Sequence, residues 1–406
     1  MLGKLINFFW FFLYISNIQF PFLPDKARTR LLVSLIGFVY YLFKFKGHDE
    51  YKVSKLVKMI LPLALWMFFS IAINSSSQIW FLQYVVLQMI YAVGAVFVIQ
   101  TGKLYEWSRL LWMMVIYVVV QDTIAFAAFQ IPSLTPLLYS IQVPELSADR
   151  ADELLQIRAI GLGEFGLFGG GIWVAIGLLS LTMLYKMEKM KGILYIALFM
   201  YMLITGLFVA RTSLTGLLSL TLLLVPLKKN WYKALIWAAW GGVFLILLQS
   251  VEKRLESQGF ATYYAFELFD KYRETGHVQS NSYDITREMW RTLPTDEKTW
   301  IIGDAQYEDE RGGYYMHTDV GYLRVLFYGG LIGLFLYLLY IYKLTRLVYI
   351  RSGKDNQIKL FLTVYYLLVL IWMWKGHCDT NFVLYLLLFS VTMKRNLLMR
   401  QLKLKV

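Results

Sequence analysis

The sequence predicts an all-α polytopic membrane protein. Of its 406 residues, 58% are apolar and 17% are aromatic. Only 17% are charged, whereas a soluble globular protein carries about a quarter. A helix needs about 20 mostly apolar residues to cross the hydrocarbon core of a bilayer, and such runs recur along the chain. These observations exclude a water-soluble, disordered, collagen-like or coiled-coil protein.

Twelve apolar runs are candidate transmembrane helices, so we expect about 12 spans. Three of the runs are shorter than a full span. The first follows Lys4 like a signal peptide, but because no small-residue cleavage site comes after it, we expect a retained helix. The runs cover approximately residues 5–24, 31–43, 56–73, 79–100, 110–131, 160–185, 193–210, 212–227, 231–250, 319–342, 360–374 and 381–393.

The distribution of basic residues predicts the orientation, because cytoplasmic loops are enriched in Lys and Arg. With twelve spans, the N-terminus and six further segments fall on one side and together hold 24 Lys and Arg against five Asp and Glu. Both termini are therefore predicted to be cytoplasmic. The net charge of +13 comes mostly from these cytoplasmic segments and reflects membrane orientation. Nucleic acid is therefore not an expected partner. Lys26, Arg28 and Arg30 are exceptions, since they fall outside. The six segments are 44–58, 101–109, 186–191, 228–233, 343–359 and 394–405.

The chain shows no internal repeat or flexible linker, which predicts one membrane domain with a large insertion. Residues 1–250 hold the first nine helices, and residues 319–406 hold the last three and the cytoplasmic C-terminus. Between them, the loop 251–318 contains 8 basic and 13 acidic residues, so it is acidic and lies on the opposite side of the membrane. A loop of this length is usually functional or disordered.

The large loop is expected to contain amphipathic helices. In segment 282–293, Ile285, Met289 and Leu293 fall on one face of a 3.6-residue helix. Arg287 and Arg291 fall on the opposite face. This pattern predicts a helix lying on the bilayer surface, and segment 261–272 has a similar pattern.

Four ionisable residues remain inside the predicted spans, and all of them fall on the extracytoplasmic side. Such a residue costs roughly 2.5 to 3.5 kcal/mol at mid-helix, so each requires a partner or a wet cavity. Two further arginines join them, one entering from a loop and one in a short turn between apolar runs. We therefore expect a polar cavity near the outer leaflet, lined by Asp122, Glu164, Asp319, Arg324, Arg158 and Arg211.

The residue types of this group are those of an anion site. Arg158, Arg211 and Arg324 are permanently charged and can bind phosphate through two parallel hydrogen bonds. His317 and Asp319 can accept a proton from a hydroxyl group. If a helix begins near residue 317, His317 and Arg324 share one face of it. The alternative is structural, since a lone Arg at a helix end is commonly an interfacial anchor and Asp122 can pair with Arg324.

Two other patterns in the sequence give little evidence of a functional site. Cys378 is the only cysteine, so no internal disulfide can form, and no Cys and His residues have the spacing of a metal site. We expect neither a metal nor a cofactor. Residues 161–166 read GLGEFG and match G-x-G-x-x-G, but no strand precedes them and they enter an apolar run. Close helix packing or a broken helix end explains these glycines better than a dinucleotide site.

The order of several motifs resembles that of the Wzy-type O-antigen polymerases and the related O-antigen ligases. An Arg precedes a Gly-rich helix (IRAIGLGEFG), an Arg-Thr-Ser turn follows (VARTSLTGLL), and a long loop ends in TREMWRTL, WIIGDAQY and MHTDVGYLRVLFYGGLIGL. The resemblance covers roughly residues 155–340. It places the essential arginines of the family on Arg158 and Arg211 and its loop histidine on His317. Asp319 stands where the family often has Asn or Ser.

The resemblance implies a GT-C-like glycosyltransferase of the bacterial inner membrane with its active site facing the periplasm. An undecaprenyl-diphosphate-linked oligosaccharide would donate its glycan to a sugar hydroxyl of a second lipid-linked unit, without a metal. Arg158, Arg211 and Arg324 would bind the diphosphate, and His317 with Asp319 would accept the proton. A chain-length regulator in the membrane is a further implied partner. Weaker candidates for glycan or lipid contact are Arg287, Arg291, Asp122 and Glu164.

Two other functions remain open from the sequence. A ligase would transfer a finished glycan to a lipid A–core acceptor, and it differs from a polymerase in the length of its product. A secondary transporter or flippase also combines about twelve spans with buried charges. The large outer loop, the one-sided charges and the absence of visible symmetry between the two halves favour the glycosyltransferase.

Overall fold

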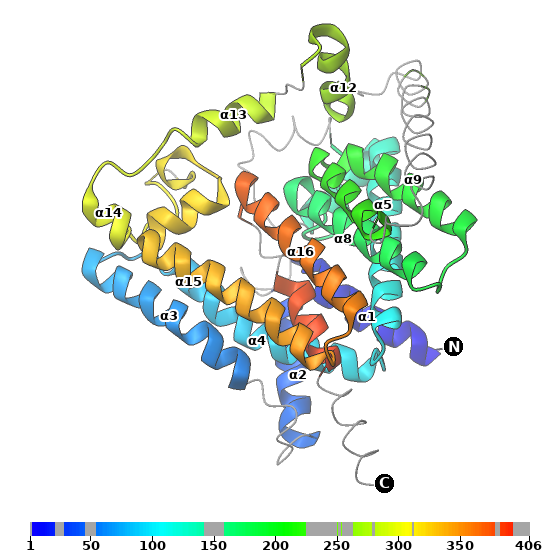
Figure 1. Cartoon of the computed structure of the whole chain (residues 1–406), viewed down its shortest axis with the longest axis horizontal. Helices are drawn as coiled ribbons and strands as arrows, with labels where there is room; N and C mark the ends of the chain where they lie inside the picture. Colours follow the sequence, from blue (N-terminus) through cyan, green and yellow to red (C-terminus); the bar gives the residue numbers. More distant parts are fainter. Residues whose placement is uncertain are drawn as a thin grey trace. The chain divides into compact units, whose positions relative to one another are not determined.

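A computed structural model describes residues 2–20, 28–44, 54–141, 158–224, 250, 253, 263–277, 281–310, 312–377 and 382–392 (Figure 1). Within these ranges the chain forms helices and turns and contains no strand. Seven of the described helices are long and apolar enough to cross a membrane, so the protein is an all-α, multi-pass membrane protein. Residues 231–249 of the expected helix 231–250 lie outside the described residues, and the count of twelve stays a prediction.

The seven long apolar helices are α3 (Ser54–Asn74), α4 (Trp80–Thr101), α5 (Trp107–Gln130), α8 (Leu167–Lys186), α9 (Gly192–Val209), α15 (Gly321–Arg351) and α16 (Asn356–Lys375). The shorter elements are α1 (Leu2–Ser16), α2 (Thr29–Lys44), η2 (Pro132–Leu134), α6 (Thr135–Ser140), η3 (Arg211–Leu220), α10 (Thr221–Leu224), α12 (Tyr263–Thr275), α13 (Asn281–Met289), α14 (Glu297–Ile301) and η5 (Tyr315–His317). A further apolar helix covers Phe382–Thr392.

The chain divides into two compact units. Unit 1 comprises Met1–Ile15, Arg30–Trp107 and Asn281–Val406, and unit 2 comprises Ser16–Thr29 and Ser108–Ser280. Helices α3, α4, α15 and α16 therefore belong to unit 1, and α5, α8, α9 and α12 to unit 2. The division at residues 250 and 318 that the sequence suggests stays a prediction.

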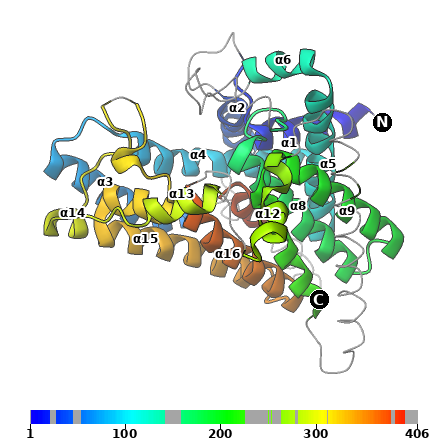
Figure 2. The ribbon, with the colours of Figure 1, turned by 90° about the horizontal axis from the view of Figure 1, so that it is seen from above.

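In unit 1, α3 lies along α15 (Figures 1 and 2). The face of α3 that carries Leu63 and Met67 is buried, whereas Leu65 and Phe68 on the opposite face are 59% and 60% exposed. A helix that is apolar on both faces buries one against protein and offers the other to lipid. This exposed face is the surface expected of a membrane helix.

Helix α15 is interrupted at Gly330, whose φ of 67° and ψ of −171° lie outside the helical region. The interruption frees backbone carbonyls, and the loop after α14 binds them: Asp304 N donates to Phe327 O and Ala305 N donates to Tyr328 O at 3.1 Å. From α3, Trp66 Nε1 donates to the carbonyl oxygen of the residue before Gly330 at 2.7 Å. Buried carbonyls require such partners, so this junction fixes the loop against α15.

Arg30 caps the end of α1. Its side chain is 1% exposed, and its Nε and Nη2 atoms donate to the carbonyls of Tyr14 and Ile15 at 3.0 and 2.9 Å. The last carbonyls of a helix have no partner within the helix, and a cation stabilises that end. Arg30, one of the exceptions to the predicted distribution of basic residues, is thus buried and binds backbone carbonyls.

In unit 2, the run 212–227 was expected to be a membrane helix, but residues Arg211–Leu220 form the 3₁₀ helix η3. Hydroxyl groups favour this winding: Thr215 Oγ1 donates to Thr212 O at 2.7 Å, across the same three residues that a 3₁₀ hydrogen bond spans. Close packing against α8 and α9 also depends on small residues, since a Cβ atom on Gly171 would lie 2.9 Å from Thr212 Cβ.

Two predicted spans are shorter than expected, the first at its C-terminal end and the sixth at its N-terminal end. Helix α1 ends at Ser16, and α8 begins only at Leu167, so the GLGEFG run forms a turn before α8. In this turn, Gly163 has a φ of +67°, and a Cβ atom there would collide with the carbonyl oxygen of Ser16. The close approach lets Glu164 N donate to the same oxygen at 2.8 Å, which joins the turn to the end of α1.

Candidate functional site

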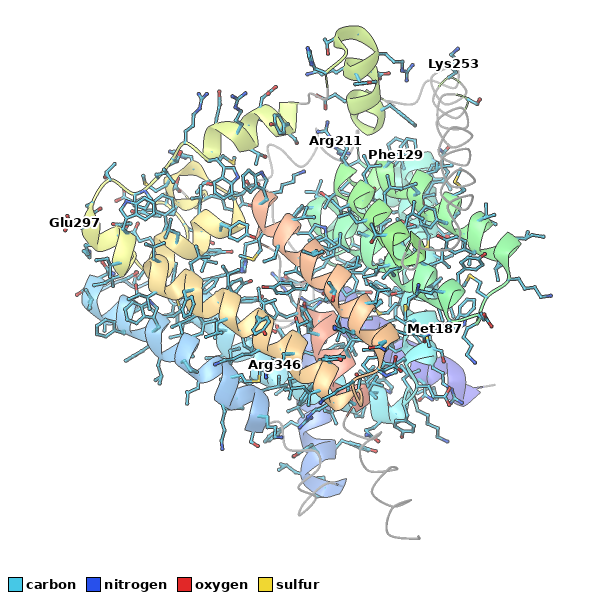
Figure 3. The ribbon with its side chains drawn as sticks, viewed as in Figure 1. Phe129, Met187, Arg211, Lys253, Glu297 and Arg346 are labelled. Carbon is cyan, nitrogen blue, oxygen red and sulfur yellow. The ribbon has the colours of Figure 1, made fainter. Side chains whose placement is uncertain are left out.

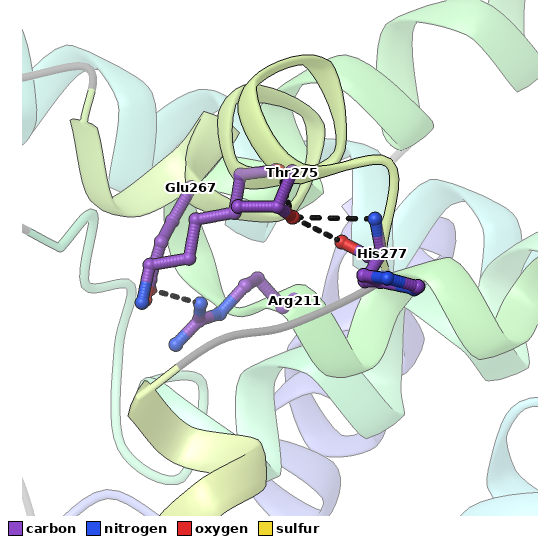
Figure 4. A network of polar contacts seen from close by, with 5 residues as sticks. Arg211, Glu267, Thr275 and His277 are labelled. Atoms are coloured by element: carbon purple, nitrogen blue, oxygen red, sulfur yellow. Dashed lines mark hydrogen bonds and ion pairs between the residues drawn. The ribbon is translucent and has the colours of Figure 1, made fainter.

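Arg211 opens η3 directly after α9 ends at Val209. Figure 3 shows it at the end of unit 2 opposite Met187, which lies in the basic turn between α8 and α9. The guanidinium reaches α12 of the large loop and forms an ion pair with Glu267 (Figure 4). The Glu267 side chain is buried at 1% exposure and that of Arg211 is largely buried at 9%, and Lys271 Nζ lies 3.4 Å from the other oxygen of Glu267. These three residues are the Arg211 cluster.

Arg158 is brought to the same end of unit 2. The neighbouring Ala159 N donates to the carbonyl of Phe208 at 2.9 Å, three residues before Arg211. The chain at Arg158 therefore runs beside the end of α9, and the side chain of Arg158 is half-buried. Arg158 and Arg211, the two arginines that the family resemblance identifies, thus both lie near the end of α9.

Two hydroxyl groups follow Arg211 in the first turn of η3. Thr212 and Ser213 are buried, and neither hydroxyl has a hydrogen-bond partner among the described residues. The first backbone N–H groups of a helix also lack a partner within the helix, and they favour an anion. Arg211 therefore lies among further potential hydrogen-bond donors, and the anion that it binds in this structure is the carboxylate of Glu267.

A second cluster of polar groups lies in unit 1 around Arg324. The guanidinium carbon lies 3.6 Å from the ring centre of Tyr307 and 4.3 Å from that of Tyr314. The side chain is 8% exposed, and its Nε atom has no hydrogen-bond partner within the described ranges. The contacts with aromatic faces stabilise the buried charge, and the edge of the guanidinium keeps its hydrogen-bonding capacity.

Asp319 and His377 lie in the electrostatic field of Arg324. Burial raises the pKa of Asp319, although Lys375 and Arg324 partly oppose this change. Burial, together with the charge of Arg324, lowers the pKa of His377 to about 3. His377 is therefore neutral at physiological pH, and its Nε2 atom lies 3.1 Å from the hydroxyl of Tyr337.

His317 lies in η5 and is exposed to solvent. Helix α15 begins at Gly321, so the expectation that His317 and Arg324 share a helical face is wrong. Met316 and His317 both have positive φ angles, 54° and 52°. Non-glycine residues rarely adopt this conformation, and those that do are often found at functional sites.

A polar network precedes His317 in the large loop. Tyr315 donates to Asp304 at 3.1 Å, and Thr299 donates to the other oxygen of Asp304 at 2.7 Å. Burial raises the pKa of Tyr315 to about 12, with a smaller contribution from the charge of Asp304. Because Asp304 is also held to α15 through its backbone, the network fixes the chain just before His317.

The arginines of the predicted surface helix are exposed. Arg287 lies in α13, but the helix ends at Met289, so Arg291 lies beyond it. The predicted helix over 282–293 is thus shorter at its C-terminal end. Met289 packs against the buried start of α15, whereas Ile285 remains 52% exposed. The placement of this segment on a bilayer surface stays a prediction.

The remaining two predicted residues belong to unit 2. Asp122 is fully buried in α5, and neither of its carboxylate oxygens has a hydrogen-bond partner among the described residues. Glu164 lies in the turn before α8, not within a helix, and it accepts a hydrogen bond from Asn17 Nδ2. Asp122 is therefore the more unusual of the two acids, because a buried carboxyl group in a membrane helix normally has a partner.

The predicted site residues are divided between the two units. Unit 2 contains Arg158, Arg211, Asp122 and Glu164, and unit 1 contains Arg287, Arg291, His317, Asp319 and Arg324. Sequence reasoning missed Glu267 and His377. A signal for Glu267 was present, since it is the single charge in the apolar stretch AFELF. No group of three or more His, Cys, Asp and Glu side chains in the described part of the chain could hold a metal ion.

The chain matches no family model, no curated protein and no solved structure. The family resemblance therefore stays a prediction.

Proposed function

We propose that this protein polymerises polyprenyl-diphosphate-linked oligosaccharides at the periplasmic face of the bacterial inner membrane. The observation that carries the proposal is the Arg211 cluster. A buried guanidinium at the end of a membrane helix binds an anionic group presented by the large loop. A site that holds a carboxylate in this way has the charge and the donors to hold a phosphate.

The proposed reaction is glycosyl transfer between two lipid-linked units. The oxygen of an acceptor hydroxyl bonds to the anomeric carbon of the donor while the bond from that carbon to the diphosphate oxygen breaks. Arg158 and Arg211 neutralise the charge that develops on the leaving diphosphate, with Arg324 as a further candidate. His317, assisted by Asp319, accepts the hydroxyl proton. Exposure suits His317 to this role, because an acceptor sugar can reach its ring.

The proposed orientation agrees with the polarity of unit 2. Lys186 ends α8, Lys189 and Lys191 lie in the turn that follows, and Arg211 lies at the other end of α9. If basic turns are cytoplasmic, Arg211 lies near the periplasmic surface. With twelve spans, the same rule places both termini in the cytoplasm. The proposed partners are the undecaprenyl-diphosphate substrates and a chain-length regulator.

Chain growth on a synthetic lipid-linked donor tests the proposal. Arg211→Ala and Arg158→Ala in the purified full-length protein should abolish the ladder of products, because each removes a cation from the diphosphate. Arg346→Ala serves as the matched control, since Arg346 lies near the opposite end of α15 from the large loop (Figure 3). Transfer of one unlengthened glycan to lipid A–core would indicate a ligase. Normal chain growth by a folded Arg211→Ala variant would refute the proposal.

One observation favours a transporter as the second candidate. Asp122 is fully buried in a membrane helix without a hydrogen-bond partner for its carboxylate oxygens among the described residues. Such carboxyl groups commonly carry protons or ions in transporters. A flux assay on proteoliposomes distinguishes the candidates: ion-coupled uptake that Asp122→Asn abolishes, without glycan transfer, would support transport.

A further inference from the structure

The proposed diphosphate site is occupied by a group of the chain itself. Glu267 places a carboxylate on Arg211, and each of its oxygens interacts with a different cation, Arg211 or Lys271. A carboxylate and a phosphate bind a guanidinium through the same two N–H donors. The two groups therefore compete for Arg211.

Helix α12 contacts the end of α9 and the start of η3 through two neighbouring residues, Phe266 and Glu267. Phe266, directly before Glu267, packs edge-on against Phe208 at a centroid distance of 5.9 Å, and both rings are buried. Phe208 lies near the end of α9, and Arg211 follows it by three residues. One turn of α12 thus covers the end of α9 and the start of η3, with an apolar contact beside an ionic one.

We propose that α12 is a lid that closes the anion site, with Glu267 as an internal competitor that lipid diphosphate must displace. This inference rests on the proposed function, because it takes Arg211 as the diphosphate-binding residue. When the lid opens, Glu267 keeps a cation within reach, since Lys271 lies one turn further along the same helix and is 26% exposed. The carboxylate of Glu267 can therefore leave Arg211 and still have the positive charge of Lys271 beside it.

The energetics of a buried ion pair suit such a switch. Attraction within the pair is offset by the cost of removing both charges from water, so the pair contributes little net stability. If Glu267 alone is removed, Arg211 is left buried without an anion, and its affinity for phosphate should rise. For a lid that is open in roughly 1–10% of molecules, loss of the competitor raises the apparent affinity roughly 10- to 100-fold.

Binding of farnesyl diphosphate, a short polyprenyl diphosphate, to the full-length protein in nanodiscs tests the lid. Glu267→Gln keeps the shape of the side chain and should tighten binding roughly 10- to 100-fold, measured by titration calorimetry. Asp270→Asn is the matched control, because this carboxylate lies on the same helix but pairs with Arg273 at 3.0 Å. It should leave binding unchanged, and Arg211→Ala should abolish binding.

Hydrogen exchange of the unmodified protein provides a second measurement that requires no variant. Farnesyl diphosphate should accelerate amide exchange in residues 263–275, because the bound ligand releases the lid. The lid is refuted if Arg211→Ala abolishes binding while Glu267→Gln binds no more tightly and exchange in α12 is unchanged. If Glu267→Gln does not fold, the exchange result alone decides. Binding by Arg211→Ala that equals that of the unmodified protein would instead refute the proposed function.

Discussion

The junction at Gly330 offers the sharpest test of the fold, through the substitution Gly330→Ala. The backbone angles at this position, 67° and −171°, belong to a region that is essentially restricted to glycine. An added Cβ atom would also overlap the carbonyl group of Ile301. The substitution therefore strains the break in α15 and pushes away the loop that follows α14.

The magnitude follows from two contributions. Forcing alanine into this backbone region costs about 1–3 kcal/mol. Displacing the loop breaks the hydrogen bonds from Asp304 N to Phe327 O and from Ala305 N to Tyr328 O, which contribute about 1 kcal/mol each. The free energy of unfolding of Gly330→Ala should therefore fall by about 3–5 kcal/mol.

The assay is thermal unfolding of the purified protein in detergent, followed by tryptophan fluorescence. Gly353→Ala is the matched control, because Gly353 also has a positive φ of 78° but a Cβ atom there would meet nothing within 4 Å. Alanine in such an open left-handed position costs only about 1–2 kcal/mol. If the two variants unfold at the same temperature, the proposed collision with Ile301 is refuted.

Three further outcomes are expected. Ser70→Ala should lower the free energy of unfolding by about 1 kcal/mol, since its hydroxyl lies within 3.0 Å of the Ile302 and Tyr328 carbonyls; combined with Gly330→Ala, the two losses should be less than additive in the same melts. Arg30→Met should cost about 3 kcal/mol, measured by chemical unfolding, because two charged hydrogen bonds to α1 are lost. A hydrogen bond from Thr299 N holds the pKa of Asp296 below its usual value of 3.8, so the stabilisation of α14 should be present above this pH and disappear as the pH falls through the lowered pKa. Protection of the amides of residues 297–301, measured as exchange relative to the intrinsic rate at each pH, should fall over the same range, and constant protection would contradict this.

The long helices were predictable from hydropathy alone. The expected spans 79–100 and 110–131 differ from α4 and α5 by at most three residues at either end. This agreement has a simple cause, since a run of about 20 apolar residues in lipid must satisfy its backbone internally and therefore forms a helix. The amphipathic helix at 282 was also foreseen, although its C-terminal end was placed too far along the chain.

Other features depend on contacts that hydropathy does not contain. Hydropathy does not distinguish the 3₁₀ helix η3 from an α-helix, because the same apolar residues fit both. The 3₁₀ conformation depends instead on hydroxyl groups within the segment and on glycines in the neighbouring helices. The capping role of Arg30 requires the end of α1 to lie beside it. The pairing of Arg211 with Glu267 joins residues 56 positions apart, so the sequence indicated both charges without their partnership.

The division of the site residues between two units was also beyond sequence reasoning. The basic and acidic residues of the predicted spans share a predicted depth, and depth alone suggested one group. Depth does not specify which helices are neighbours, because that depends on packing in the plane of the membrane. Arg324 illustrates the difference, since its immediate partners are Tyr307 and Tyr314 of the large loop.

The winding of η3 gives this segment a strict threefold register. Three residues complete each turn of a 3₁₀ helix, so residues three apart form a straight row. Ser213, Gly216 and Ser219 form such a row, and all three are buried; a Cβ atom on Gly216 would lie 3.1 Å from Ala175 Cα. Deleting one residue would rotate this row by about 120° and turn bulkier side chains toward α8. Deleting three would shorten the segment by a whole turn and restore the small residues to their contact.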